Sequence, residues 1–154
     1  MAVMIEPATA NDLDAVRLLF REYETWLGVS LCFQGFEEEV AALPGRYAPP
    51  AGALIVARDA AAVAGVVAMR PLDERIAEMK RLYVRREYWG RGIGRALTVA
   101  IIEAARFAGY RAMRLDTMAR MTAAVALYRT LGFVEIPAYT YNPEADVLYL
   151  ERAL

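Results

Sequence analysis

The chain has 154 residues and a formal net charge of −1, with 58% hydrophobic and 24% charged residues; this suits one domain with a sizeable core and makes an extended polyanion a poor principal partner. It has no histidine and one cysteine, Cys32, which excludes an internal disulfide, a Ser-His-Asp triad, a Cys-His pair and most zinc sites. We expect no bound metal, and we expect Cys32 to be a small buried apolar side chain.

The N-terminal half is predicted to form a strand, two helices and a hairpin. Residues 3–5 are a candidate edge strand, and a helix is predicted from Ala10 to Leu27. Thr9 and Asp12 form an approximate capping box at its start, and Gly28 ends it. The other elements expected in this half are a helix over 36–43 and strands over 53–57 and 63–69 joined as a hairpin.

The C-terminal half alternates strands and helices. The expected elements are strands over 76–84 and 112–117, helices over 92–108 and 122–131, and a final strand pair over 133–136 and 147–150. The resulting order, βααβββαβαββ, indicates a single mixed α/β domain over residues 1–154. The unit from 76 to 117 predicts a parallel, right-handed crossover.

A glycine-rich turn links the strand over 76–84 to the main helix. Gly90, Gly92 and Gly94 stand at alternate positions, so the backbone can approach an anion closely at the helix N-terminus. The spacing does not match a Rossmann fingerprint, and the lysine of a Walker loop is absent. The turn therefore predicts another phosphate cradle, or a plain strand-to-helix turn that uses glycine for close packing.

Two segments resemble the signatures of the GNAT superfamily of N-acetyltransferases. Leu82-Tyr83-Val84 followed by Trp89-Gly90-Arg91-Gly92-Ile93-Gly94 is similar to the acetyl-CoA signature. Ala124, Leu127-Tyr128 and Leu131-Gly132-Phe133 are similar to the second signature, and both lie on the matching elements. Trp89 stands where the family carries Gln or Arg, and Met121 stands where it often carries Asn. The resemblance covers essentially the whole chain and implies a mostly antiparallel sheet with helices on both faces.

The resemblance implies a cofactor site for acetyl-CoA. The main chain of Val84 would pair with the pantetheine arm, and the Leu82 amide would lie near the thioester carbonyl. The pyrophosphate would meet main-chain amides of the turn, contributed by Arg91, Gly92, Ile93, Gly94, Arg95 and Ala96. The guanidinium groups of Arg91, Arg95 and Arg129 either reach the phosphates or are solvated charges on a helix face.

The resemblance also implies catalytic roles. Tyr128 is the candidate acid for the departing thiolate and is also counted in the cofactor site; the alternative is an aromatic side chain that only packs. The Leu82 amide is the candidate oxyanion donor. Glu78 is the candidate base, although four strand residues, roughly 13 Å, separate it from Leu82. Its alternatives are a structural ion pair for Glu78 and proton loss to bulk water.

The family builds its acceptor pocket from the loop between the first two helices and from the last strand pair. The candidate wall residues here are Trp26, Phe33, Gln34 and Tyr139, with Tyr141 and Asn142 nearby. Such a wall suits a small, partly apolar amine, although each aromatic ring has core packing as its alternative. Arg70, Lys80 and Arg81 are either holders of a substrate carboxylate or solvated surface charges.

The combined prediction is an enzyme that moves an acetyl group from acetyl-CoA to a primary amine of a small molecule or peptide, by direct transfer in a ternary complex. The alternatives are a non-catalytic acyl-CoA sensor with the same fold and a nucleotide-binding enzyme with another phosphate loop. No apolar run approaches the ~20 residues of a membrane span, and the first 15 residues do not resemble a secretion signal. We expect a cytoplasmic protein with no nucleic-acid or membrane partner, and a homodimer is plausible.

Overall fold

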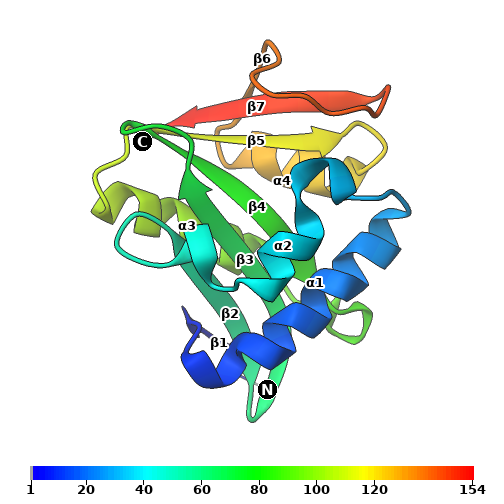
Figure 1. The fold of residues 1–154 in the computed structure, drawn as a ribbon, viewed down its shortest axis with the longest axis vertical. Helices are drawn as coiled ribbons and strands as arrows, with labels where there is room; N and C mark the ends of the chain where they lie inside the picture. Colours follow the sequence, from blue (N-terminus) through cyan, green and yellow to red (C-terminus); the bar gives the residue numbers. More distant parts are fainter. Residues whose placement is uncertain (1) are drawn as a thin grey trace.

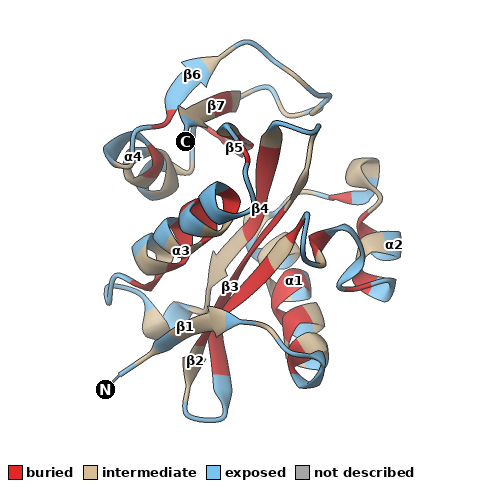
Figure 2. Ribbon diagram, turned by 90° about the vertical axis from the view of Figure 1, so that its left-hand side faces the viewer, coloured by how far each residue is buried: buried red, intermediate tan, exposed pale blue. Residues whose placement is uncertain are grey.

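A seven-stranded sheet runs through the middle of the computed structural model, which describes residues 2–154, and helices cover both of its faces (Figures 1 and 2). The strand order is β1-β2-β3-β4-β5-β7-β6. The strands are β1 (Met4–Pro7), β2 (Ala53–Asp59), β3 (Ala62–Pro71), β4 (Ile76–Val84), β5 (Ala112–Met118), β6 (Val134–Ile136) and β7 (Val147–Ala153). The α-helices are α1 (Leu13–Leu27), α2 (Phe36–Ala41), α3 (Ile93–Phe107) and α4 (Thr122–Thr130).

Alternation along β3 shows why the sheet is apolar on both faces. Val66 and Ala68 belong to the core under α1 and α2, whereas Val67 and Met69 belong to the core under α3 and α4. Successive side chains of a strand point to opposite faces. A continuous apolar run is therefore the pattern expected of a strand that is covered on both sides.

The crossover β4-α3-β5 gives the sheet its one parallel pair, and this pair is short. Ile76 to Glu78 pair with Ala112 to Arg114, whereas all the other strand pairs are antiparallel. Beyond Glu78 the two strands separate toward their carboxyl ends, as the green and yellow arrows of Figure 1 show. The sheet is thus split at the end where ligands of parallel strands bind.

The predicted elements, their order and the parallel crossover are confirmed. The first predicted helix opens with a short 3-10 turn, Ala10–Asp12, where the Thr9 backbone N–H donates to the Asp12 carboxylate at 2.8 Å. The final strand is longer than predicted and reaches Ala153, because β7 pairs with all of β5.

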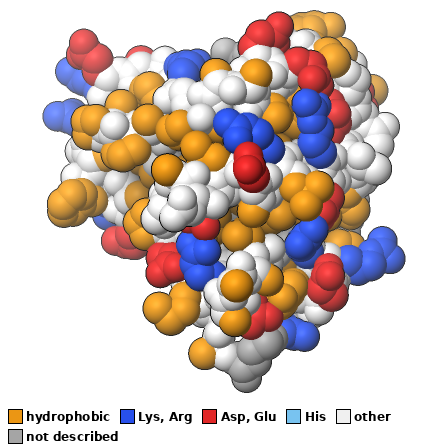
Figure 3. All heavy atoms as spheres, turned by 60° about the horizontal axis from the view of Figure 1, so that its bottom comes forward, with side chains coloured by type: hydrophobic (Ala, Val, Ile, Leu, Met, Phe, Trp, Pro, Cys, Tyr) orange, Lys and Arg blue, Asp and Glu red, His pale blue; other side chains and the backbone are white. Residues whose placement is uncertain are grey.

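The helices and the surface add two observations. Within residues 2–154 no helix combines the length and the apolar character that crossing a bilayer requires. Acidic, basic and apolar side chains are interspersed on the face shown in Figure 3, in keeping with a net charge of −1.

Candidate functional site

Two hollows meet where β4 and β5 separate. The first, which we call the groove, measures about 400 Å³ and runs along β4 to the glycine turn. The second, which we call the inner cavity, measures about 70 Å³ and lies between the strands on the side of the α1–α2 connection. The residues that line both are Tyr23, Leu27, Leu82, Thr117 and Tyr128. A ligand in the groove can therefore reach the inner cavity at these five side chains.

The glycine turn is shaped to receive an anion. Gly90 and Gly92 have φ of +79° and +75°, and a Cβ built on either would meet no atom within 4 Å. Their lack of a side chain therefore leaves open space beside the backbone and relieves no internal clash. Gly92 is also the N-cap of α3, whose first turn carries no acidic side chain. A pyrophosphate fits a helix N-terminus of this kind.

Not every residue of the turn contributes a backbone donor to this cradle. The Ala96 amide donates to the Gly92 carbonyl at 3.0 Å and so belongs to the helix ladder. The amides of Ile93, Gly94 and Arg95 precede the first such bond, as the opening amides of a helix do. The expectation that Ala96 meets the pyrophosphate through its amide is therefore corrected.

The arginines of this region take separate positions. The Arg91 guanidinium lies 5.2 Å from the centre of the Tyr88 ring. Arg95 is exposed, and Arg129 is exposed with the Glu135 carboxylate 3.9 Å away. Neither Arg91 nor Arg95 lines the groove. Their reach to a phosphate stays a prediction.

A β-bulge shapes β4 beside Leu82. Lys80 pairs with Ala68 and Tyr83 pairs with Val66, so two residues of β4 oppose the single Val67 of β3. Arg81, one of those two, has φ of +62°, a conformation that a non-glycine residue keeps only where its surroundings impose it. The bulge changes the course of the backbone immediately before the Leu82 amide.

A buried ion pair, which we call the clasp, holds the bulged residue. The Arg81 guanidinium donates to both oxygens of Glu39 on α2, each at 2.9 Å, and lies 5.2 Å from the centre of the Phe36 ring. The side chains of Arg81 and Glu39 are 2% and 12% exposed. Since Arg81 is buried, the reading of it as a solvated surface charge is wrong.

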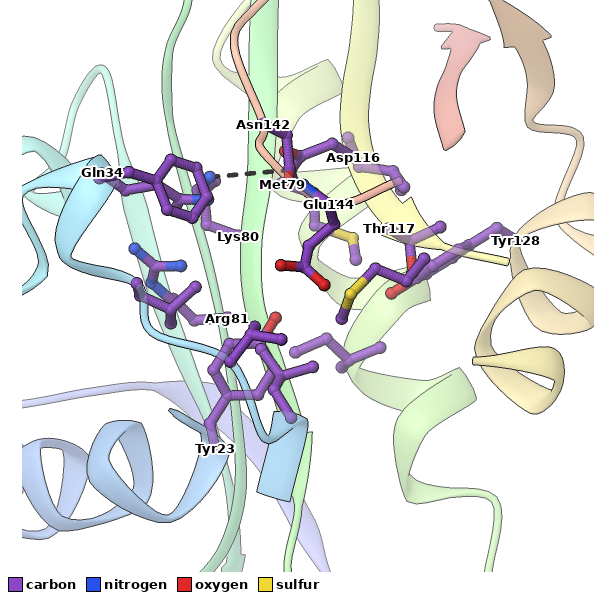
Figure 4. Close-up of a pocket in the computed structure, with 17 residues that line it drawn as sticks. Tyr23, Gln34, Met79, Lys80, Arg81, Asp116, Thr117, Tyr128, Asn142 and Glu144 are labelled. Carbon is purple, nitrogen blue, oxygen red and sulfur yellow. Dashed lines mark hydrogen bonds and ion pairs between the residues drawn. The ribbon is translucent and has the colours of Figure 1, made fainter. Parts of the chain in front are cut away.

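Two tyrosines stand at the junction of groove and inner cavity. Tyr128 is buried, its ring packs edge-on against Phe133, and its hydroxyl points toward the inner cavity (Figure 4). Burial raises the pKa of the Tyr128 phenol well above 10, and Tyr23 and Asp116 raise it further. Burial also raises the pKa of Tyr23. Both phenols therefore stay protonated at neutral pH and can donate a proton or a hydrogen bond.

The inner cavity carries charged groups from both separated strands. The Lys80 ammonium on β4 lies 3.8 Å from the Asp116 carboxylate on β5, directly beyond the last pair of the parallel ladder (Figure 4). The Asn142 amide nitrogen donates to the other Asp116 oxygen at 3.1 Å. Both charged side chains are buried, at 5% and 8% exposure. Burial lowers the pKa of Lys80, and the nearby Asp116 only partly opposes this.

Glu78 belongs to a separate buried cluster. Its carboxylate accepts from the Arg70 guanidinium at 3.0 Å and from the Tyr139 hydroxyl at 2.7 Å, and the residue is 1% exposed. Neither Glu78 nor Tyr139 lines the groove or the inner cavity. The structure therefore does not bring Glu78 together with Leu82 and Tyr128, and its proposed base role stays a prediction.

The other predicted site residues divide between the two hollows. Val84, Gly92, Ile93 and Gly94 line the groove, and Phe33 and Gln34 line the inner cavity. Trp26, expected in the acceptor wall, lies instead at the groove, with its ring 6.3 Å from that of Trp89. Cys32 is exposed, so the expectation that it is buried is wrong. It follows a 3-10 turn boundary in the α1–α2 connection, where no core layer covers it.

The sequence analysis missed Asp116, Glu144, Tyr23 and Glu39. Asp116 had a usable signal, because it follows Arg114 at strand spacing within an otherwise apolar segment and so faces the same side of the sheet. Glu144 lies on the loop before β7 and gave no signal. Within residues 2–154 no group of three or more His, Cys, Asp or Glu side chains is placed to hold a metal ion.

Comparison with known proteins identifies the family. The model of the acetyltransferase (GNAT) family matches residues 14–133. An uncharacterized N-acetyltransferase of Schizosaccharomyces pombe is 40% identical over 91% of this chain and 87% of its own. Two solved structures share the fold. The PaiA N-acetyltransferase of Thermoplasma acidophilum in complex with coenzyme A has a TM-score of 0.80, 18% identity and full coverage of both chains. The acetyltransferase YncA of Salmonella typhimurium, solved with acetyl-CoA, has a TM-score of 0.74, 18% identity and coverage of 99% and 94%. The chain belongs to the GNAT family of N-acetyltransferases.

Proposed function

We propose that this chain transfers the acetyl group of acetyl-CoA to a primary amine of a small molecule or peptide, directly and within a ternary complex. The observation that carries the proposal is the meeting of two hollows at Leu82 and Tyr128, where the sheet is split. The groove suits a long ligand with an anionic end at the glycine turn. The inner cavity suits an amine that approaches from the opposite side.

The chain's own groups can serve each step. Leu82, directly after the bulge, would donate its amide hydrogen to the carbonyl oxygen as charge develops there, which is worth a few kcal/mol. The amine nitrogen forms its bond to the acetyl carbon and loses a proton, while the carbon–sulfur bond breaks. Tyr128 would give its phenolic proton to the departing sulfur. Its raised pKa keeps that proton in place until transfer.

The route of the amine proton has two candidates. Glu78 could receive it only by relay through Tyr139, whose hydroxyl donates to the Glu78 carboxylate. An acceptor that enters from solvent could instead lose its proton to bulk water before it binds. A pH profile of kcat/KM for Glu78→Gln separates the two, because only the relay makes the acidic limb depend on Glu78.

A sensor that binds acyl-CoA without catalysis is the second candidate. The Trp89 indole donates to the Val84 carbonyl at 2.8 Å, and the family resemblance assigns the Val84 backbone to the pantetheine arm. A protein used only for binding could tolerate such a competitor. A homodimer and a cytoplasmic location stay predictions.

Thiol release from acetyl-CoA, measured against a panel of primary amines, tests the proposal. We expect amine-dependent release, an acetylated product by mass, and a higher melting temperature with CoA. Tight CoA binding without transfer to any amine would favour the sensor. Stabilisation by ATP or NAD but not by CoA would favour a different nucleotide enzyme.

A further inference from the structure

The charged donors of the inner cavity are already engaged by other side chains. The Arg81 guanidinium is bound by Glu39 in the clasp, and the Arg70 guanidinium, outside the cavity, is bound by Glu78. Lys80 faces Asp116, and the pKa of Lys80 is lowered by burial. An anionic group that entered would have to displace one of these carboxylates. The expectation that Arg70, Lys80 and Arg81 hold a substrate carboxylate therefore has no support from their contacts.

Acceptor atoms, in contrast, remain available. The buried Gln34 Oε1 lines the cavity and has no hydrogen-bond partner among the described residues. Glu144 receives one hydrogen bond, from the half-exposed Arg120 to its Oε1 at 3.1 Å, and its carboxylate points into the cavity (Figure 4). A buried amide oxygen without a donor is costly, and an incoming ammonium would supply that donor.

The size and walls of the cavity restrict what carries this ammonium. About 70 Å³ is far below the usual volume of a pocket for a whole ligand, so only the head of the acceptor enters. The wall nearest α1 is apolar and consists of Leu27, Val29, Leu31 and Phe33. A slender alkyl chain can pack there, whereas a carboxylate beside the amine would be desolvated without a free cation.

We propose that the acceptor is a small alkyl amine that carries no carboxylate on the carbon next to its amino group, and that Gln34 and Glu144 bind its ammonium. This inference rests on the proposed acetyltransferase function. It excludes α-amino acids as preferred acceptors, and it assigns specificity to two residues from different segments, one in the α1–α2 connection and one before β7.

The test compares matched pairs that differ only by the carboxylate: isoamylamine with leucine, ethanolamine with serine, and tyramine with tyrosine. At saturating acetyl-CoA we expect kcat/KM to be at least about tenfold higher for the amine of each pair, the size of one lost charge-assisted interaction. An amino acid equal to or better than its amine overturns the inference, as does a peptide amine better than every small amine.

A variant arm locates the specificity. Glu144→Gln is expected to raise KM for the amine about tenfold and to leave KM for acetyl-CoA unchanged. Glu135→Gln is the matched control, because Glu135 is an exposed glutamate on β6 that pairs with Arg129 at 3.9 Å, away from the cavity. Equal effects of the two variants overturn the role of Glu144.

The outcomes also separate the inference from the proposed function. If CoA raises the melting temperature but neither member of any pair is acetylated, the acceptor inference is overturned and the cofactor site stands. If CoA has no effect on melting and no thiol is released, the proposed function fails and the inference fails with it.

Discussion

The groove and the inner cavity meet at the same five side chains but are built in different ways. The groove follows one stretch of chain, from Leu82 to Gly94, and presents backbone amides, glycines and a helix N-terminus. The inner cavity collects side chains from α1, the α1–α2 connection, β4, β5 and the loop before β7. The contrast suggests that cofactor binding depends on backbone geometry, and that acceptor choice depends on which side chains the fold brings together.

The largest expected effect comes from the clasp, which lies between the two regions. Glu39→Gln leaves the Arg81 guanidinium buried without a counter-charge, so we expect a loss of about 3 kcal/mol in the free energy of unfolding and a fall in kcat. Urea denaturation and initial rates measure the two. Glu37→Gln is the matched control: Glu37 also lies on α2 and pairs with Arg21 over the same Phe36 ring, but this pair is exposed and should cost less than about 1 kcal/mol. Equal losses would contradict the clasp.

Tyr128→Phe tests the chemistry at the junction. We expect kcat to fall about 100-fold with the Kd of acetyl-CoA unchanged, because the proton donor is lost and the ring is kept. Since the pKa of Tyr128 is raised above 10, wild-type kcat should show no loss from its ionisation below pH 10. Stopped assays over pH 6–10 and calorimetry measure these. If Tyr23→Phe carries the loss instead, the acid is Tyr23.

Gly92→Val tests whether the groove works through its backbone. A β-branched residue at φ of +75° is strained, and its side chain would fill the open space of the cradle. We expect the Kd of CoA to rise about 30-fold, or roughly 2 kcal/mol. Gly109→Val, at φ of +93° beyond the far end of α3 and equally open, carries similar strain without facing the groove. A similar rise in Kd for both variants would assign the effect to lost stability.

Trp89→Phe is expected to have the smallest effect. It removes the N–H that binds the Val84 carbonyl and keeps an aromatic ring beside Trp26. We expect acetyl-CoA to bind about threefold more tightly, because a neutral hydrogen bond is worth about 1 kcal/mol. Trp26→Phe, which leaves the Val84 carbonyl untouched, should bind unchanged in the same titration. Weaker binding by Trp89→Phe would mean that the indole itself packs on the cofactor.

The parts of the site that sequence reasoning found are those that neighbouring residues determine. Gly90 and Gly92 were recognised by local spacing, and Tyr128 by its place on a short helix that ends at Gly132. Glu78 was placed correctly on its strand, but its partners Arg70 and Tyr139 come from other segments. Its enclosure away from both hollows could not be predicted, since it depends on cross-strand register and on a loop 61 residues later.

The sequence alone determined the order of the elements, the parallel crossover and the glycine cradle, because helix caps, apolar periodicity and glycine spacing act over a few residues. Only the tertiary structure decided where β4 and β5 part, that Lys80 meets Asp116 across the gap, and that Glu39 holds the bulge at Arg81. These contacts join residues 36 to 42 positions apart, and the free energy of a buried charge depends on whether its partner arrives at the same place. Local pattern carries no information about that arrival.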